Sequence, residues 1–276
     1  MRIQHTTLSI FILLSIFSCS RDIKVTINKY SYSDSIVQDF KSSNISLNYL
    51  SDVNLCLLSC PSGNLQTDKV VKSINRSILE LIAPDYINEP YDSICYHLVR
   101  DYIEEMNQIT TSHFSYDLDE ETEDKDQYDS IAYHFYNNIN TDCRIGLGDS
   151  IVCYTYNLSS YVGGAHPADL SYAYSYSLLN GNKIHPNLLF TRENKPKMLS
   201  RIIDKLIKQN QVSSKEELRG LGIEVLQLTD NILLDKDSIT FHYDTYSIAP
   251  YAYGEINIKF SYDEISDIFI WTNSKG

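Results

Sequence analysis

The stretch "SYVGGAHPADLSYAYSYSLLNGNK", residues 160–183, decides the fold expected for this chain. Within it, two glycines, a histidine and a proline follow Tyr161, which ends one tyrosine-rich segment, and precede a second tyrosine-rich segment. From Tyr172 to Leu178 large and small residues alternate, which is the two-residue period of a β-strand with one buried face. Asn180-Gly181 then predicts a tight hairpin turn. The stretch therefore predicts antiparallel strands on both sides of a glycine-rich loop.

The segment Gly163-Gly164-Ala165-His166-Pro167 is either a reactive loop or a turn that shapes the chain. Glycine permits a positive φ or a close approach of the backbone, and proline restricts the residue before it to an extended conformation. We expect His166 to hydrogen-bond to backbone across a seam between two modules, rather than to act as a catalytic residue or a ligand. On this interpretation, His166→Ala lowers the stability of the fold.

Outside this stretch, apolar residues recur at helical spacing in some segments and at strand spacing in others. The helical spacing predicts helices over residues 67–82, 91–108 and 195–209. A final helix is expected over residues 262–272, because Ser261 and Glu264 have the spacing of a capping box. The predicted fold class is α+β, with two α+β modules of mostly antiparallel sheets and helices packed on one face.

The N-terminal residues resemble an export signal. An apolar run from Leu8 to Phe17 follows Arg2, and it is shorter than the about 20 residues that a membrane-spanning helix needs. It ends in "SIFSC", which resembles a bacterial lipobox. We expect residues 1–18 to be a lipoprotein signal peptide, Cys19 to be lipidated, and residues 19–23 to be a tether. The protein would then lie in the cell envelope, on the periplasmic or outer-membrane face, and contact the membrane through its lipid.

Charge and motifs restrict the function. A formal net charge of -13 disfavours nucleic acid as a partner and favours a cationic one. The sequence contains no Walker loop, dinucleotide fingerprint, H-E-x-x-H or G-x-S-x-G. The acidic segment at residues 117–129 lacks the turn glycine of a calcium loop, which favours a solvated connection. We expect no cofactor, no metal and no catalytic residue.

Two kinds of modification are suggested by short patterns. Cys143 and Cys153 flank "RIGLGDSIV", a predicted hairpin, and are the best candidates for a disulfide. The alternative is that the cysteines after residue 19 are small buried hydrophobes. Asp-Ser-Ile recurs at turn-to-strand boundaries, where it has a local structural cause, and it also resembles a periplasmic O-glycosylation motif of Bacteroidetes. The candidate acceptors are Ser35, Ser93, Ser130, Ser150 and Ser238.

Two longer motifs carry a family resemblance. "YVGGAHPADLSYAYSYSLLNGNKIHPNLLF" and "DSITFHYDTYSIAPYAYGEINIKFSYDEI" are similar to the extracellular region shared by the lysozyme-sensing anti-sigma factor RsiV, the accessory part of the peptidoglycan deacetylase PdaC and many bacterial lipoproteins. The first motif matches at Tyr161, Gly163, Gly164, Ala165, His166 and Pro167. The second matches at Tyr246, Ile248, Ala249, Pro250, Tyr251 and Gly254.

The resemblance implies a PdaC-like module over residues 24–168 and an RsiV-like module over residues 169–276. It also implies binding rather than catalysis, since this region grips lysozyme in the sensor. The resemblance covers neither the sigma-binding segment nor the deacetylase domain of those relatives. The leading hypothesis is a non-catalytic envelope lipoprotein that binds an envelope protein, such as a lysozyme-like muramidase, or a peptidoglycan fragment. A glycan hydrolase or deacetylase and a purely structural envelope component are the alternatives.

Overall fold

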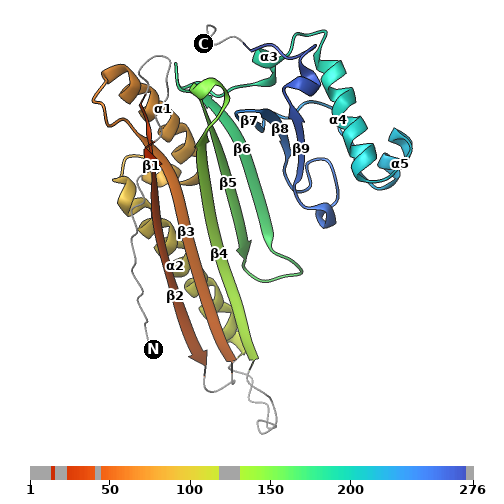
Figure 1. Cartoon of the computed structure of the whole chain (residues 1–276). Coiled ribbons are helices and arrows are strands. Elements are labelled where there is room, and N and C mark those ends of the chain that lie inside the picture. Colours follow the sequence, from red (N-terminus) through yellow and green to blue (C-terminus); the bar gives the residue numbers. More distant parts are fainter. Residues whose placement is uncertain (1–13, 16–23, 41–44, 118–130, 272–276) are drawn as a thin grey trace.

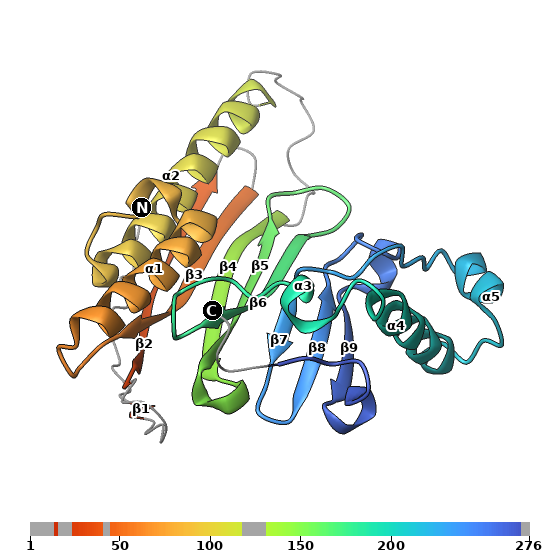
Figure 2. The same ribbon diagram turned by 90° about the horizontal axis from the view of Figure 1, so that it is seen from above.

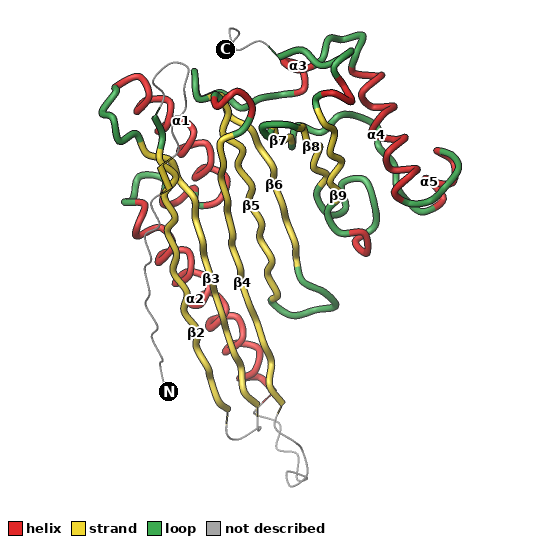
Figure 3. Tube along the Cα trace, viewed as in Figure 1, coloured by secondary structure: helices red, strands yellow, loops and turns green. Residues whose placement is uncertain are grey.

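The computed structural model describes residues 14–15, 24–40, 45–117 and 131–271. Its strands form a six-stranded sheet and a three-stranded sheet, and helices cover one face of each (Figures 1 and 2). The expected α+β class, with mostly antiparallel strands, is confirmed. Figure 3 shows the helices gathered at the two sides of the strands. Within the described residues, no helix has the length and apolar character needed to span a bilayer.

The strands of the six-stranded sheet lie in sequence order, and all except the first are long. Its strands are β1 (Leu14–Ser15), β2 (Thr26–Phe40), β3 (Ile45–Ser59), β4 (Ile131–Ile145), β5 (Ile151–Tyr161) and β6 (Ala168–Ser177). Neighbouring strands are antiparallel except β3 and β4, which run parallel. The helices α1 and α2 lie between β3 and β4 in the chain, and a connection of that length is what a parallel pair needs.

The helices α1 (Leu65–Ile82) and α2 (Tyr91–Asp117) pack on one face of this sheet, with a 3-10 turn at Pro84–Tyr86 between them (Figure 2). The helix expected from residue 67 begins earlier, because the Asn64 side chain accepts hydrogen bonds from the N–H groups of Gln66 and Thr67. The helix expected to end at residue 108 continues to Asp117.

The second half of the chain packs on the opposite face. Its elements are α3 (Pro186–Leu189), α4 (Lys195–Gln209), α5 (Lys215–Gly220), β7 (Ile232–Leu234), β8 (Ser238–Tyr243), β9 (Ile256–Ser261) and 3-10 turns at Tyr251–Tyr253 and Asp263–Ile265. The prediction of a helix over 195–209 is confirmed.

The final helix expected over 262–272 is wrong. The capping box does form, since Ser261 N–H donates to Glu264 Oε2 at 2.7 Å and Glu264 N–H donates to Ser261 Oγ at 3.3 Å. Only the 3-10 turn Asp263–Ile265 follows it. Ile270 N–H donates instead to Leu189 O, so a contact with a distant segment replaces the next helical hydrogen bond.

The strands β5 and β6 serve two cores at once. On one face Val152, Tyr154 and Tyr176 join the core with α1 and α2, and on the other Ile151, Cys153 and Ala173 join the core with β7–β9. The expected module boundary at residue 168 coincides with the first residue of β6, which pairs with β5. Ser175 fastens the layers together, because its buried Oγ donates to Ile232 O and accepts from Leu234 N–H.

The expected disulfide between Cys143 and Cys153 does not form, and both are free thiols. The predicted hairpin is present, but Cys143 pairs with Tyr154 and Cys153 pairs with Arg144. This offset of one residue points the two thiols to opposite faces of the sheet. Cys143 lies with Cys56 in the core beside α1 and α2, and Cys153 lies in the core beside β7.

Candidate functional site

The two sequence motifs meet in space. His166, from the loop between β5 and β6, stacks on Tyr251, from the loop between β8 and β9, with ring centroids 4.1 Å apart and 22° between the planes. His166 Nε2 lies 3.5 Å from the hydroxyl of Tyr246, and the rings of Tyr246 and Tyr251 are 5.5 Å apart. We call His166, Asp169, Tyr246 and Tyr251 the junction surface.

Asp169 supplies a negative charge at this surface. The Tyr251 hydroxyl donates to Asp169 Oδ2 at 2.9 Å and also lies 3.4 Å from Pro167 O. The hydrogen bond to Asp169 raises the pKa of Tyr251, so the Tyr251 hydroxyl stays protonated at neutral pH. The cluster thus offers aromatic rings, a hydroxyl and a carboxylate to a ligand.

A hydrogen-bond network beneath the surface holds the two loops together. Asp244 Oδ1 accepts from Ser171 N–H at 2.9 Å and from Thr245 N–H at 2.8 Å. Ser171 Oγ lies 2.7 Å from His242 Nε2, and His242 Nδ1 lies 2.8 Å from Asn257 Oδ1. This network ties β6 to β8 and β9, and so positions the loop that carries Tyr246 and Tyr251.

The Ser171, His242 and Asn257 contacts have the residue types of a nucleophile, a base and an orienting group. Ser171 is 6% exposed and His242 is 4% exposed, so a substrate has no approach to the hydroxyl in this conformation. His166 is exposed on its loop and contacts different partners. The two histidines are therefore not arranged around one reacting centre. Within the described part of the chain, no cluster of histidine, cysteine and acidic side chains could hold a metal ion.

Backbone strain accompanies the exposed aromatic side chains. Gly163 and Gly164 adopt φ values of +101° and +104°, a region open mainly to glycine. Tyr246 has φ +67° although its side chain is bulky, and that side chain is 62% exposed. A bulky residue in this region is strained, and such strain is concentrated at functional sites. Burial does not explain why a tyrosine is held there.

Other residues of the motifs shape the loops. The Tyr161 hydroxyl donates to Gly164 O at 2.9 Å and closes the glycine turn. In the second motif, Ile248 O accepts from Glu224 N–H at 2.9 Å, Ala249 is buried, and Gly254 has φ +61°. The ring of Pro250 lies so near Gly222 that a Cβ on that glycine would be 3.0 Å from it.

His166 contacts the second module through side chains of that module. The expectation was a hydrogen bond to backbone across the seam, but the backbone partner of His166 Nδ1 is O of the adjacent Pro167, at 2.8 Å. Contact with the second module comes from Tyr246 and Tyr251. Sequence reasoning also missed Asp169 and Asp244. Asp169 lies two residues after Pro167, so its proximity to the motif was the available signal.

The proposed modification sites lie in different environments. Ser35 is exposed on β2, Ser93 and Ser150 are half-buried, and Ser238 is 1% exposed. A glycan therefore has access to Ser35 in the folded chain, and Ser238 is closed to it. Cys19 and Ser130 lie outside the described residues.

His166→Ala is expected to lower the free energy of unfolding by only about 0.5–1 kcal/mol, because the side chain is exposed and loses one aromatic stack. The direction is the one expected from the sequence, and the exposed position of His166 limits the size of the effect. Urea unfolding of the wild type and the variant measures the difference. A loss of about 3 kcal/mol would restore the view that His166 is a structural residue of the seam.

Comparisons with known proteins agree with the fold. Residues 187–263 match the model of a family described as "Protein of unknown function (DUF3298)". A crystal structure of a DUF3298 family member from Bacteroides fragilis superposes with a TM-score of 0.69 and 20% identity, covering 89% of this chain and 94% of that chain. A crystal structure of a DUF3298 family protein from Pseudomonas aeruginosa PAO1 superposes with a TM-score of 0.52 and 16% identity, covering 90% of this chain and 96% of that chain. No curated protein sequence matches this chain.

Proposed function

We propose that this chain is a non-catalytic lipoprotein of the cell envelope that binds a cationic envelope protein, of the lysozyme-like muramidase class, on its junction surface. The observation that carries the proposal is the meeting of the two motifs, in which exposed His166 and Tyr246 and half-buried Tyr251 form a cluster beside Asp169. These motifs are the ones that resemble the lysozyme-sensing RsiV region.

The chemistry of the surface supports a protein partner. Tyrosine side chains give large, rigid contact areas at low entropy cost and are enriched at binding hot spots. The loops that carry them are already held by the Asp244 and His242 hydrogen bonds, which reduces the ordering needed on binding. A net charge of -13 attracts a cationic protein over long range. Lipidation at Cys19 would keep the surface at the envelope.

Calorimetry with c-type lysozyme and with peptidoglycan fragments tests the proposal, using the chain from residue 24 onward. We expect lysozyme to bind, and Tyr251→Ala to weaken its affinity about 30-fold, because a hot-spot residue contributes about 2 kcal/mol. Tyr253→Ala is the matched control, since Tyr253 is an exposed tyrosine in the same 3-10 turn, and it should change the affinity less than about 3-fold.

Three results would contradict the proposal in different ways. Absence of lysozyme binding at high micromolar concentration would exclude the muramidase class. Binding of peptidoglycan fragments alone would replace the protein partner by a glycan. Equal effects of Tyr251→Ala and Tyr253→Ala would place the contact outside the junction surface.

A further inference from the structure

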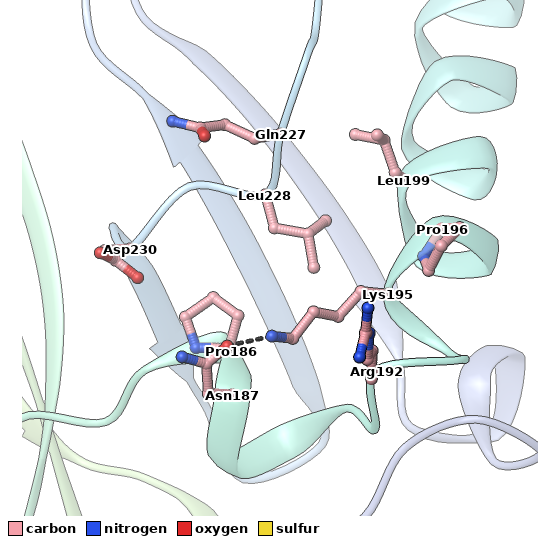
Figure 4. Close-up of a pocket in the computed structure, with 9 residues that line it drawn as sticks. All are labelled: Pro186, Asn187, Arg192, Lys195, Pro196, Leu199, Gln227, Leu228 and Asp230. Atoms are coloured by element: carbon pink, nitrogen blue, oxygen red, sulfur yellow. Dashed lines mark hydrogen bonds between the residues drawn. The ribbon is translucent and has the colours of Figure 1, made fainter.

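A pocket of about 380 Å³ lies in the second half of the chain and shares no lining residue with the junction surface (Figure 4). It is bordered by α3, the segment before α4, the first turns of α4 and the segment that precedes β7. Small-molecule sites have volumes of roughly 300–1,000 Å³, so this pocket is large enough for a small ligand. The residues that line it include Pro186, Arg192, Lys195, Leu199, Leu228 and Asp230.

The pocket has an apolar wall and a cationic side. Pro186 is buried, and Leu199 and Leu228 are half-buried. Figure 4 shows Arg192 and Lys195 on one side of the pocket and Asp230 on the other, with Leu228 between them. A surface of this kind matches a molecule that has a negatively charged end and an apolar body.

The requirements of helix formation do not explain the positions of Arg192 and Lys195. The first turn of α4 holds Lys195 and Lys197 and no acidic residue, although the N-terminal end of a helix carries a partial positive charge. Lys197 attracts the neighbouring Glu193, whose pKa is lowered mainly by hydrogen bonds to its own backbone N–H and to Thr191. That leaves Arg192 and Lys195 toward the pocket.

Neither of these two cations is neutralised by a carboxylate among the described residues. Lys195 Nζ donates to the neutral side chain of Asn187, and Arg192 has no ion pair or hydrogen bond to another described residue. Asp230 is paired with His185 Nδ1 at 3.3 Å, outside the cationic side. An acidic chain with a net charge of -13 thus keeps two cations beside an apolar wall without a carboxylate of its own between them.

We propose that this pocket binds a small organic monoanion, a carboxylate attached to an apolar body, with the carboxylate between Arg192 and Lys195 and the body against Leu199 and Leu228. Charge-assisted hydrogen bonds from a guanidinium and an ammonium to a carboxylate are the stronger kind. Asp230 at the far side repels a second negative group, so a monoanion is preferred over a dianion. This site shares no residue with the junction surface, so its test is independent of the proposed function.

The test compares matched carboxylates and amides of the same shape, which differ in charge alone. The pairs are hexanoate and hexanamide, octanoate and octanamide, and 3-phenylpropionate and 3-phenylpropionamide. Each compound is titrated into the chain from residue 24 onward, and saturation-transfer NMR measures its binding. We expect at least one carboxylate to bind about 10-fold more tightly than its amide. Arg192→Gln with Lys195→Gln should reduce that preference to less than about 2-fold.

Lys197→Gln is the matched control, since Lys197 belongs to the same helical turn and donates to Asn194 Oδ1 at 3.2 Å outside the pocket lining. It should keep the preference for carboxylate. Thermal unfolding confirms that the variants are folded, as expected for substitutions at exposed and half-buried positions. The proposal is wrong if no carboxylate binds at about 10 mM, if amides bind equally well, or if the double variant retains the preference.

Discussion

Gly146→Ala is expected to lower the free energy of unfolding by about 3 kcal/mol or more. Gly146 lies in the turn between β4 and β5, and a Cβ built on it would be 2.0 Å from Leu234 O and 2.9 Å from Cys153 Sγ. Leu234 belongs to β7, and the Ser175 side chain holds the backbone of this strand by hydrogen bonds to Ile232 O and Leu234 N–H. The methyl group therefore has to displace a strand, and the core between the two sheets opens with it.

Gly220→Ala is the matched control for this substitution. Gly220 is the last residue of α5, and nothing lies within 4 Å of a Cβ built there, so alanine should change the stability by less than about 1 kcal/mol. Differential scanning calorimetry should give a fall in Tm of about 6–12 °C for Gly146→Ala. A melting temperature equal to that of the wild type would mean that β7 does not approach this turn.

The contrast between these two glycines shows what local sequence patterns can predict. "RIGLGDSIV" predicts a hairpin through its turn residues, and the hairpin is present between β4 and β5. The close approach of β7 depends on a residue that lies 88 positions later, at Leu234, and no local pattern encodes that distance. The helix α4 was predicted with its bounds because its periodicity is local and its apolar side packs directly on the core.

The errors in the predicted fold have the same origin. The pairing of Cys143 with Cys153 required a register that placed both thiols on one face, and the observed register is offset by one residue. The final helix was expected from a capping box that does form, but Ile270 pairs with Leu189 instead of continuing the helix. In both cases the local chemistry was identified, and a contact between distant segments decided the outcome.

The junction surface was predictable in part. The motifs around His166 and Tyr251 were both identified, and each contains residues that now form the cluster. Their meeting depends on Asp244, which bonds to the backbone of Ser171 on β6, and on the left-handed backbone of Tyr246. Neither feature can be recognised in a single sequence. An aspartate before a turn is too common to single out Asp244, and no sequence pattern predicts a tyrosine with a positive φ, which is exceptional.

Alkaline pH is expected to unfold this protein between about pH 10.5 and 12 because of its buried tyrosines. Burial raises the pKa of Tyr156 to about 12 and raises the pKa of Tyr154, Tyr176 and Tyr243 above the ordinary value. All four side chains are at most 5% exposed. In the unfolded chain a tyrosine ionises near pH 10, so the fold holds protons that the unfolded chain has already released.

The direction in which stability changes with pH follows from this difference in proton binding between the folded and unfolded chain. Below about pH 10 the four tyrosines are neutral in both states, and their contribution to stability is complete. Above it, the unfolded state loses protons first, and each group removes about 1.4 kcal/mol of stability for each pH unit up to its pKa in the folded state. Four groups remove about 5 kcal/mol by pH 11, which is comparable to the total stability of many domains.

Tyr156→Phe isolates the contribution of one group. Phenylalanine keeps the ring that stacks on Tyr172 and removes the ionising hydroxyl, so the loss of stability between pH 8 and pH 11 should be smaller by about 1.4 kcal/mol. Tyr253→Phe, at a 39% exposed tyrosine, should reproduce the wild-type pH dependence. Urea unfolding followed by circular dichroism at pH 8, 10 and 11 measures all three chains. A wild-type free energy of unfolding that stays constant up to pH 11 would show that these tyrosines are not buried in the folded protein.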